Sequence, residues 1–371
     1  MERIGIYLHI PFCKTKCPYC DFYSIPFSEG LADAYTAALL RAMETQPFGD
    51  LRADTVYLGG GTPSLMGLKR LDALLSQTVR LFGLDGDSEI TLEANPDTVA
   101  PALLSGLRRC GYNRISFGVQ SADDRELAAL GRPHTAGQAR DAILAAYTAG
   151  FENISADLML GVPRQTLKSL EQSVEFLKSL PVRHISAYML SIEPGAAFYH
   201  LRDGLPLPNE DEEAALYLVC VELLQGAGFT QYEVSNFARE GAPCRHNLKY
   251  WRCEQYLGLG PAAHSFMGSA RYFFGKDTEA FINTRDVFSL LRCDGAGGGI
   301  AEQLMLRLRL SEGFDTKLPE LRGARPDFLL EKARELSGCG LCTVRDGVIS
   351  LTAKGFLLSN TVTAALLGGN G

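Results

Sequence analysis

The sequence has no long uninterrupted hydrophobic run. No stretch approaches the roughly 18 consecutive apolar residues that a membrane-spanning helix requires. The first residues, 1–7, lead directly into a β-branched run and lack both the apolar core and the cleavage site of a signal peptide. We therefore expect a cytoplasmic protein.

Cysteine and positive charge are also scarce. Ten cysteines in 371 residues are too few for a disulfide scaffold. The 36 Lys and Arg residues are outnumbered by 43 Asp and Glu residues, and this net charge of −7 argues against binding nucleic acid through bulk electrostatics. Hydrophobic residues make up 46% and charged residues 21%, a composition that excludes disorder and collagen.

Short β-rich runs alternate with helical patterns up to about residue 190, at roughly 30 residues per unit. Six such units predict an α/β fold with a parallel sheet, either open or partly closed as a barrel. The expected strands are Ile4–Ile10, Thr55–Leu58, Glu89–Leu92, Arg114–Phe117, Asn153–Leu158 and His184–Met189. The expected helices are Leu31–Met43, Leu68–Phe82, Val99–Cys110, Ala136–Ala149, Leu167–Leu180 and Glu210–Gln225.

The alternation stops after residue 228. We expect a further strand at Phe229–Ser235, an irregular aromatic segment over 241–265 and a flexible junction at Asp294–Gly299. A helical region over 300–337 precedes two β runs joined by Asp346–Gly347, which predict a hairpin. The expected organisation is a barrel over 1–240, a connecting segment over 241–298 and a small α+β, winged-helix-like C-terminal domain over 299–371.

Three cysteines are grouped directly after the first expected strand. Cys13, Cys17 and Cys20 form the pattern C-x3-C-x2-C on a loop rich in proline. A structural zinc site needs four ligands, and no fourth Cys or His follows at the spacing of a zinc finger. Iron–sulfur clusters also take thiolates, and three of them leave one iron of a cubane open.

This pattern, with Tyr19 before the third cysteine, resembles the radical S-adenosylmethionine (SAM) superfamily. The flanking segments Tyr7–Cys13 and Cys20–Ser24 resemble the branch that contains oxygen-independent coproporphyrinogen III oxidase and the haem chaperones. The resemblance implies a partial (β/α)6 TIM-like barrel of the radical SAM type. It also implies a [4Fe-4S] cluster on Cys13, Cys17 and Cys20.

Polar and glycine-rich signals lie where the expected strands end, at the edge where parallel β/α folds bind ligands. The resemblance implies that these residues contact SAM, whose sulfonium and ammonium suit carboxylates and amides and whose carboxylate suits an arginine. The implied contacts are Tyr7, Tyr19, Gly60, Gly61, Thr62, Glu93, Gln120, Arg132, Asp157 and Ser191.

A second constellation spans Cys244–Cys253 and contains the only tryptophan. It matches the HNxxYW signature of the haem-chaperone branch. One interpretation is a loop that packs aromatic residues over the barrel mouth. The other is a haem site, with His246 or a cysteine as axial ligand and basic residues for the propionates.

Two functions follow from the resemblance, and whether the chain is an enzyme is left open. The first is a haem chaperone that binds the cluster, SAM and haem and delivers haem to an acceptor protein, for example a respiratory and membrane-associated one. The second is an oxygen-independent coproporphyrinogen III oxidase, a radical SAM oxidoreductase that turns propionates into vinyl groups. The oxidase has a fourth cysteine where this chain has Phe22, and an extension where only three residues precede Ile4, so the chaperone is favoured. A radical SAM enzyme with an unrelated substrate is a third interpretation. An electron donor is an implied partner, and a homodimer is left open.

Overall fold

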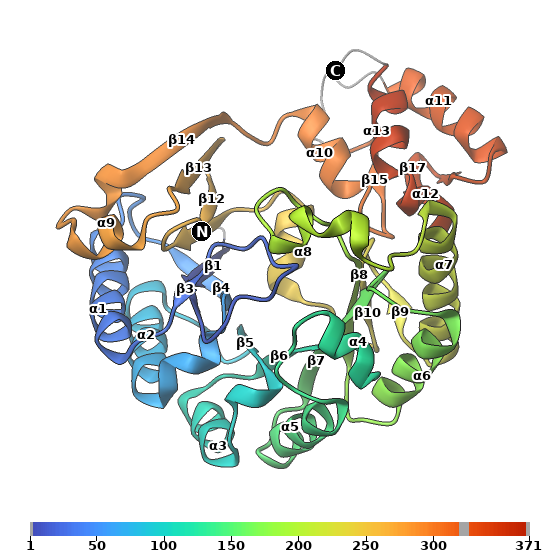
Figure 1. The fold of residues 1–371 in the computed structure, drawn as a ribbon. Helices are drawn as coiled ribbons and strands as arrows, with labels where there is room; N and C mark the ends of the chain where they lie inside the picture. The colour runs from blue at the N-terminus through green and yellow to red at the C-terminus, as the bar shows by residue number, and fades with distance from the viewer. Residues whose placement is uncertain (1–2, 319–325, 369–371) are drawn as a thin grey trace.

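The computed structural model describes residues 3–318 and 326–368 (Figure 1). Its main sheet consists of β1 (Arg3–Ile10), β4 (Arg52–Gly60), β5 (Glu89–Ala94), β6 (Arg114–Gln120), β7 (Asn153–Leu160), β8 (His184–Met189), β9 (Thr230–Gln231), β10 (Asn236–Ala238), β11 (Tyr256–Leu259), β12 (His264–Met267), β13 (Ala270–Phe274) and β14 (Leu291–Ala296). The spatial order of these twelve strands is β14-β13-β12-β11-β1-β4-β5-β6-β7-β8-β10-β9.

The strands β1 and β4 to β8 run parallel and curve into a partial barrel, as the repeats predicted. Helices cover its outer face (Figure 1): α1 (Glu29–Thr45), α2 (Gly67–Phe82), α3 (Pro101–Cys110), α5 (Ala136–Thr148), α6 (Leu167–Lys178) and α7 (Glu210–Gly226). Along β1, Ile4, Ile6 and Leu8 are buried in the core, and the alternate residues Gly5 and Tyr7 face the barrel interior. Each expected strand and helix up to residue 226 is present, with its ends shifted by a few residues.

The sheet continues past β1, and here the expectation of an irregular segment over 241–265 was wrong. That segment contains α8 (Arg245–Trp251), β11 and the start of β12. β11 pairs in parallel with β1, and β12, β13 and β14 follow antiparallel. We call β11 to β14 the sheet extension. Its strands are short, and β11 pairs with a strand some 250 residues away, so local periodicity carries little signal for it.

Two other local expectations need correction. The expected strand Phe229–Ser235 is reduced to β9 and an isolated bridge of Glu233 with Leu310, and the chain then turns back into β10, antiparallel to β8. The glycine-rich junction at Asp294–Gly299 begins inside β14, which reaches Ala296.

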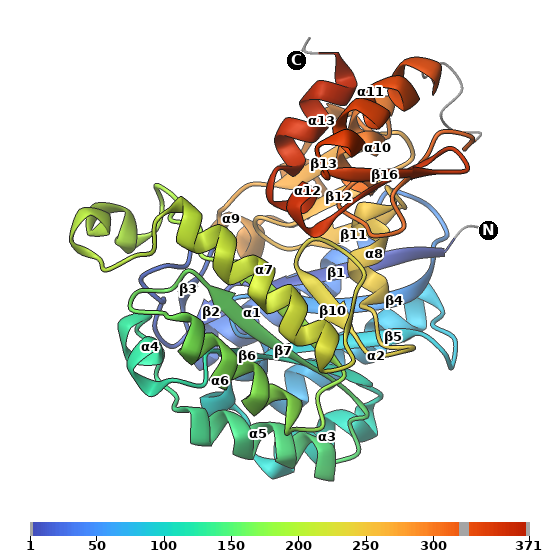
Figure 2. The same cartoon turned by 90° about the vertical axis from the view of Figure 1, so that its right-hand side faces the viewer.

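The C-terminal region packs beside α7 and α8, away from the cysteine loop (Figure 2). It contains α10 (Ile300–Arg307), β15 (Phe314–Asp315), α11 (Pro326–Gly338), β16 (Cys342–Arg345), β17 (Val348–Leu351), α12 (Ala353–Leu357) and α13 (Ser359–Leu367). The hairpin between β16 and β17 is confirmed, and Asp346 and Gly347 both have positive φ at its turn. Within the described ranges, no helix is long and apolar enough to cross a membrane.

Candidate functional site

The cysteine loop starts at the carboxyl end of β1, the end of the barrel that we call the mouth. A two-stranded pairing of β2 (Phe12–Cys13) with β3 (Ile25–Pro26) closes the base of this loop. The turn after β4 fastens it to the barrel, because Gly61 N donates to Ile10 O at 2.8 Å and Thr62 N donates to Phe12 O at 2.7 Å. A Cβ at Gly61 would lie 2.6 Å from the Phe12 carbonyl oxygen, so only glycine permits this approach.

A cavity of about 540 Å³ opens at the mouth. It is lined by most of the residues that the sequence analysis singled out: Cys13, Cys17, Cys20, Tyr19, Gly60, Gly61, Thr62, Glu93, Gln120, Arg132, Asp157 and Ser191. Two do not line it. Tyr7 lies deeper in the barrel, where its hydroxyl contacts His9 Nδ1 at 3.0 Å, and His246 lies elsewhere.

Arg132 connects the cysteine loop to the ends of two strands. Its Nη1 donates to Cys17 Sγ and to the Tyr19 hydroxyl, both at 3.4 Å. Its Nη2 donates to Asn95 Oδ1 at 2.7 Å and to Gly118 O at 2.8 Å. Its buried Nε has no partner among the described residues, so the guanidinium keeps one donor for a ligand such as a carboxylate.

Gln120 ends β6 in a strained backbone conformation. Its φ of 69° lies in the left-handed region, which costs a non-glycine residue free energy. The side chain lines the cavity, and Gln120 Oε1 accepts a hydrogen bond from the Tyr188 hydroxyl at 3.4 Å. The strain therefore aims an amide into the cavity.

Two carboxyl groups face the cavity, and they differ in the hydrogen bonds that they accept. Glu93 is tied to β4, accepting hydrogen bonds from the Tyr57 hydroxyl at 2.7 Å and from Gly60 N at 3.0 Å. Asp157 accepts one from the Ser116 hydroxyl at 3.3 Å. Burial, together with the nearby Glu93 charge, raises the pKa of Asp157 to about 7. Asp157 is thus the carboxyl group that a cationic ligand would ionise.

The three thiols suit a cluster better than a single ion. In the part of the chain that the structure describes, no three His, Cys, Asp or Glu side chains converge closely enough to hold one metal ion. A cubane binds each thiolate at a separate iron, so it needs the sulfurs spread around a larger volume. All three thiols line the cavity, Arg132 faces Cys17, and the Thr62 hydroxyl lies 3.7 Å from Cys13 Sγ. The donor set therefore fits a [4Fe-4S] cluster at Cys13, Cys17 and Cys20, with SAM in the cavity beside it.

Sequence reasoning missed two residues at this site. Asn95 bridges Arg132 to the Thr62 hydroxyl, to which Asn95 Nδ2 donates at 3.3 Å. Tyr188 projects from β8 into the cavity. Asn95 directly follows β5 at the same edge as Glu93, so its position carried the signal.

Most of the HNxxYW segment lies at the other end of the barrel, where the parallel strands begin, while its Asn247 reaches the lining of the mouth cavity. Its helix α8 packs against β4, and His246 Nδ1 lies 2.8 Å from the hydroxyl of Thr55, near the start of that strand. The other ring nitrogen, Nε2, lies 2.8 Å from the Tyr250 hydroxyl, and His246 is 0% exposed. Burial lowers the pKa of His246 to about 3.

These contacts correct both interpretations of the segment. It does not cover the mouth, and His246 offers no free nitrogen to a haem. Cys244 is also fully buried, with its Sγ 3.6 Å from Glu89 Oε1. The motif holds the closed end of the barrel together.

The fold and the cysteine site together define a class of protein, and comparisons with known proteins agree with it. Residues 7–177 match the family model of the Radical SAM superfamily, and residues 300–358 match the HemN C-terminal domain. The structure of coproporphyrinogen III oxidase (HemN) from Escherichia coli superposes with a TM-score of 0.84, covering 98% of this chain and 90% of that one. At 22% sequence identity this likeness establishes the fold. The chain is a radical SAM protein, and that superfamily implies a [4Fe-4S] cluster and SAM.

Full-length relatives narrow the family. Heme chaperone HemW of Bacillus subtilis (strain 168) is 36% identical over 98% of this chain and 98% of its own length. Heme chaperone HemW of Mycobacterium tuberculosis (strain H37Rv) is 37% identical over 99% of this chain and 95% of its own length. The chain belongs to the HemW family.

Proposed function

We propose that this protein is a haem chaperone, which binds haem and delivers it to an acceptor protein. The single observation that supports this most strongly is the identity of 36–37% to proteins named heme chaperone over nearly the whole chain. The relation includes the sheet extension and the C-terminal region, so it reaches well beyond the shared cysteine motif.

The mouth cavity supplies the second part of the proposal. Cys13, Cys17 and Cys20 would hold the cluster, and when bound it would supply an electron to SAM. Arg132 would orient the SAM carboxylate through its unpartnered Nε, and Asp157 would take up the cationic end of the ligand. The Gly60–Thr62 turn brings backbone close to the ligand.

A second candidate is the oxidative decarboxylation carried out by coproporphyrinogen III oxidase. The observation that favours it is the fold match over 98% of the chain, with a cavity fitted for the same two cofactors. Phe22, which is 68% exposed, stands where the resemblance places a fourth cysteine in that enzyme, and this weighs for the chaperone.

One experiment separates the two functions. The cluster is reconstituted without oxygen, and the protein is then given SAM, a reductant and coproporphyrinogen III, or is titrated with haem. We expect stoichiometric haem binding and no protoporphyrinogen. Formation of protoporphyrinogen would establish the oxidase instead, and failure to bind haem would reject the chaperone.

The acceptor and the accessory partners belong to the same proposal. We expect haem transfer to an apo haem protein, for which a membrane-associated respiratory subunit is the first to test. An electron donor is tested by the rate at which it reduces the cluster. Assembly into a homodimer is tested by sedimentation.

A further inference from the structure

If the protein binds haem and His246 is closed off, the axial ligand must be sought among the other side chains. The sequence has six histidines. His9 and His184 use both ring nitrogens in hydrogen bonds inside the barrel, and His134 is only 2% exposed. Only His200 and His264 are exposed.

His264 stands on a rigid element. It is the first residue of β12, paired directly with Phe273 of β13, and the two rings stack 5.6 Å apart at an interplanar angle of 23°. Among the residues that the structure describes, no hydrogen bond or ion pair engages its ring nitrogens. His200, in contrast, lies on a single 3-10 turn, where its ring contacts that of its neighbour Tyr199.

The register of the sheet extension places His264 on the face that continues the barrel interior. Tyr256 pairs with Gly5 on β1 and with Phe266 on β12, and paired residues share a face. His264, two residues before Phe266, is on the same face. It also lies toward the mouth, because the turn before it approaches the backbone of His9, near the carboxyl end of β1.

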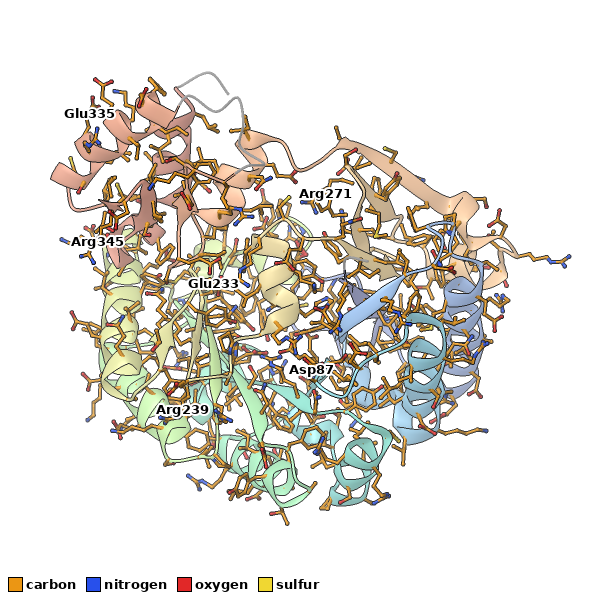
Figure 3. The ribbon with its side chains drawn as sticks, turned by 180° about the vertical axis from the view of Figure 1, so that it is seen from behind. Asp87, Glu233, Arg239, Arg271, Glu335 and Arg345 are labelled. Carbon is orange, nitrogen blue, oxygen red and sulfur yellow. The ribbon has the colours of Figure 1, made fainter. Side chains whose placement is uncertain are left out.

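Two cations flank this histidine. Arg292 of β14 pairs with Phe273, so it lies on the same face, and Lys276 follows β13. Burial lowers the pKa of His264, and the Arg271 and Lys276 charges lower it further. Neither Arg292 nor Lys276 forms an ion pair within the described ranges. Arg271 is different: it projects from β13 toward α10, where it pairs with Glu302 at 2.9 Å (Figure 3). The Asp294 carboxylate acts in the opposite direction and raises the pKa of His264.

We propose that His264 is the axial ligand of haem, with Phe273 against the porphyrin and Arg292 and Lys276 paired with the two propionates. The arrangement combines an imidazole with free nitrogens, an aromatic surface and two positive charges that form no ion pair among the described residues. The two negatively charged propionates on one edge of haem would match those two positive charges. This inference rests on the proposed function, since it names where that haem binds.

The test is a haem titration of the full-length protein, followed by its Soret absorbance. We expect His264→Ala to weaken binding by about tenfold or more and to change the ligand-sensitive part of the spectrum. His200→Ala is the matched control, because it removes the other exposed histidine, and it should bind like the wild type. A His264→Gly variant should regain the wild-type spectrum when free imidazole is added, which a merely structural role would not produce.

Charge reversal tests the propionate contacts separately. Arg292→Glu and Lys276→Glu should each weaken haem binding by roughly threefold and leave the axial-ligand spectrum unchanged. Arg285→Glu, the same charge change at an exposed position after the helix α9 (Thr278–Asn283), should have no effect.

The outcomes are distinguishable. If the wild type fails to bind haem, the proposed function and this inference both fail. If the wild type binds haem and His264→Ala keeps its affinity and spectrum, or the spectrum is that of a thiolate, only His264 is rejected.

Discussion

Both ends of the barrel contain polar side chains, but these side chains have different roles at the two ends. At the mouth, Arg132, Gln120 and Asp157 line an open cavity and keep part of their bonding capacity free. At the closed end, His246 and Glu89 are buried and their polar atoms bond to other parts of the chain. Polar residues inside a barrel thus serve ligands at one end and folding at the other.

The closed end shows how a signature motif can be structural. Glu89 accepts hydrogen bonds from the backbone N of Arg245 and of His246, both at 3.0 Å, so it fixes the start of α8. Arg114 lies near it, fully buried, and the Glu89 charge stabilises the guanidinium there, whose Nε and Nη1 have no hydrogen-bond partner among the described residues. The HNxxYW segment supplies the cover for this cluster. Most of this family signature is therefore structural, and Asn247 is the motif residue that also lines the mouth cavity.

The largest expected effect tests the mouth. Cys17→Ala should abolish the cluster, because two thiolates cannot hold the cubane, while the apo protein keeps its fold. Iron content and the visible absorbance after anaerobic reconstitution measure this. Cys339→Ala, at an exposed cysteine of the C-terminal region, is the control and should retain full iron. A Cys17→Ala protein with full iron would place the cluster elsewhere.

The next effect tests the closed end. Glu89→Ala removes a negative charge near the buried Arg114 and leaves the N–H groups of Arg245 and His246 without their acceptor, so we expect the free energy of unfolding to fall by about 3 kcal/mol. Urea denaturation measures it. Asp85→Ala, which removes the surface pair with Arg3, should cost less than about 1 kcal/mol. Equal losses in the two variants would contradict the comparison between buried and exposed charge.

These two ends also show what could be predicted from the sequence. The barrel followed from the six repeats, and the mouth followed from one rule, that parallel strands present ligands at their carboxyl ends. Asp157 and Gln120 were found in this way because each lies on or just after a strand whose hydrophobic pattern is clear.

The rest needed tertiary structure. His246 sits in a short helix whose contact with Thr55 joins residues 191 positions apart, and nothing in the local pattern indicates which end of the barrel it closes. His264 became a candidate only when β11 was seen to pair with β1. Both are long-range pairings, which periodicity does not report.

A third prediction concerns pH at the mouth. The unfolded Asp157 carboxyl ionises near 3.8, and the folded one stays protonated up to about pH 7. Between these values the folded state binds the additional proton, so its stabilising contribution falls as the pH rises, on the order of 1 kcal/mol per pH unit.

Asp157→Asn removes this dependence. The difference in unfolding free energy between wild type and variant, measured by urea denaturation from pH 4 to 8, should decline up to about pH 7 and then level off. Asp203→Asn, at an exposed position, should track the wild type throughout. A difference that is constant with pH would show that Asp157 titrates normally.

The smallest effect separates stability from binding at one residue. Gln120 has a φ of 69°, a conformation in which glycine is unstrained. Gln120→Gly should therefore raise the free energy of unfolding by roughly 0.5–1 kcal/mol, while SAM binds more weakly because the amide is gone.

Gln120→Ala completes this comparison, since it loses the same amide and keeps the strain. We expect both variants to lose SAM affinity alike, by equilibrium dialysis, and only the glycine variant to gain stability in urea denaturation. A glycine variant that gains stability and keeps its SAM affinity would show that the strained residue does not act on the ligand. If Gln120→Gly stabilises the protein and Glu89→Ala destabilises it, the mouth contains a residue that lowers stability in favour of ligand binding, and the closed end contains one that serves stability.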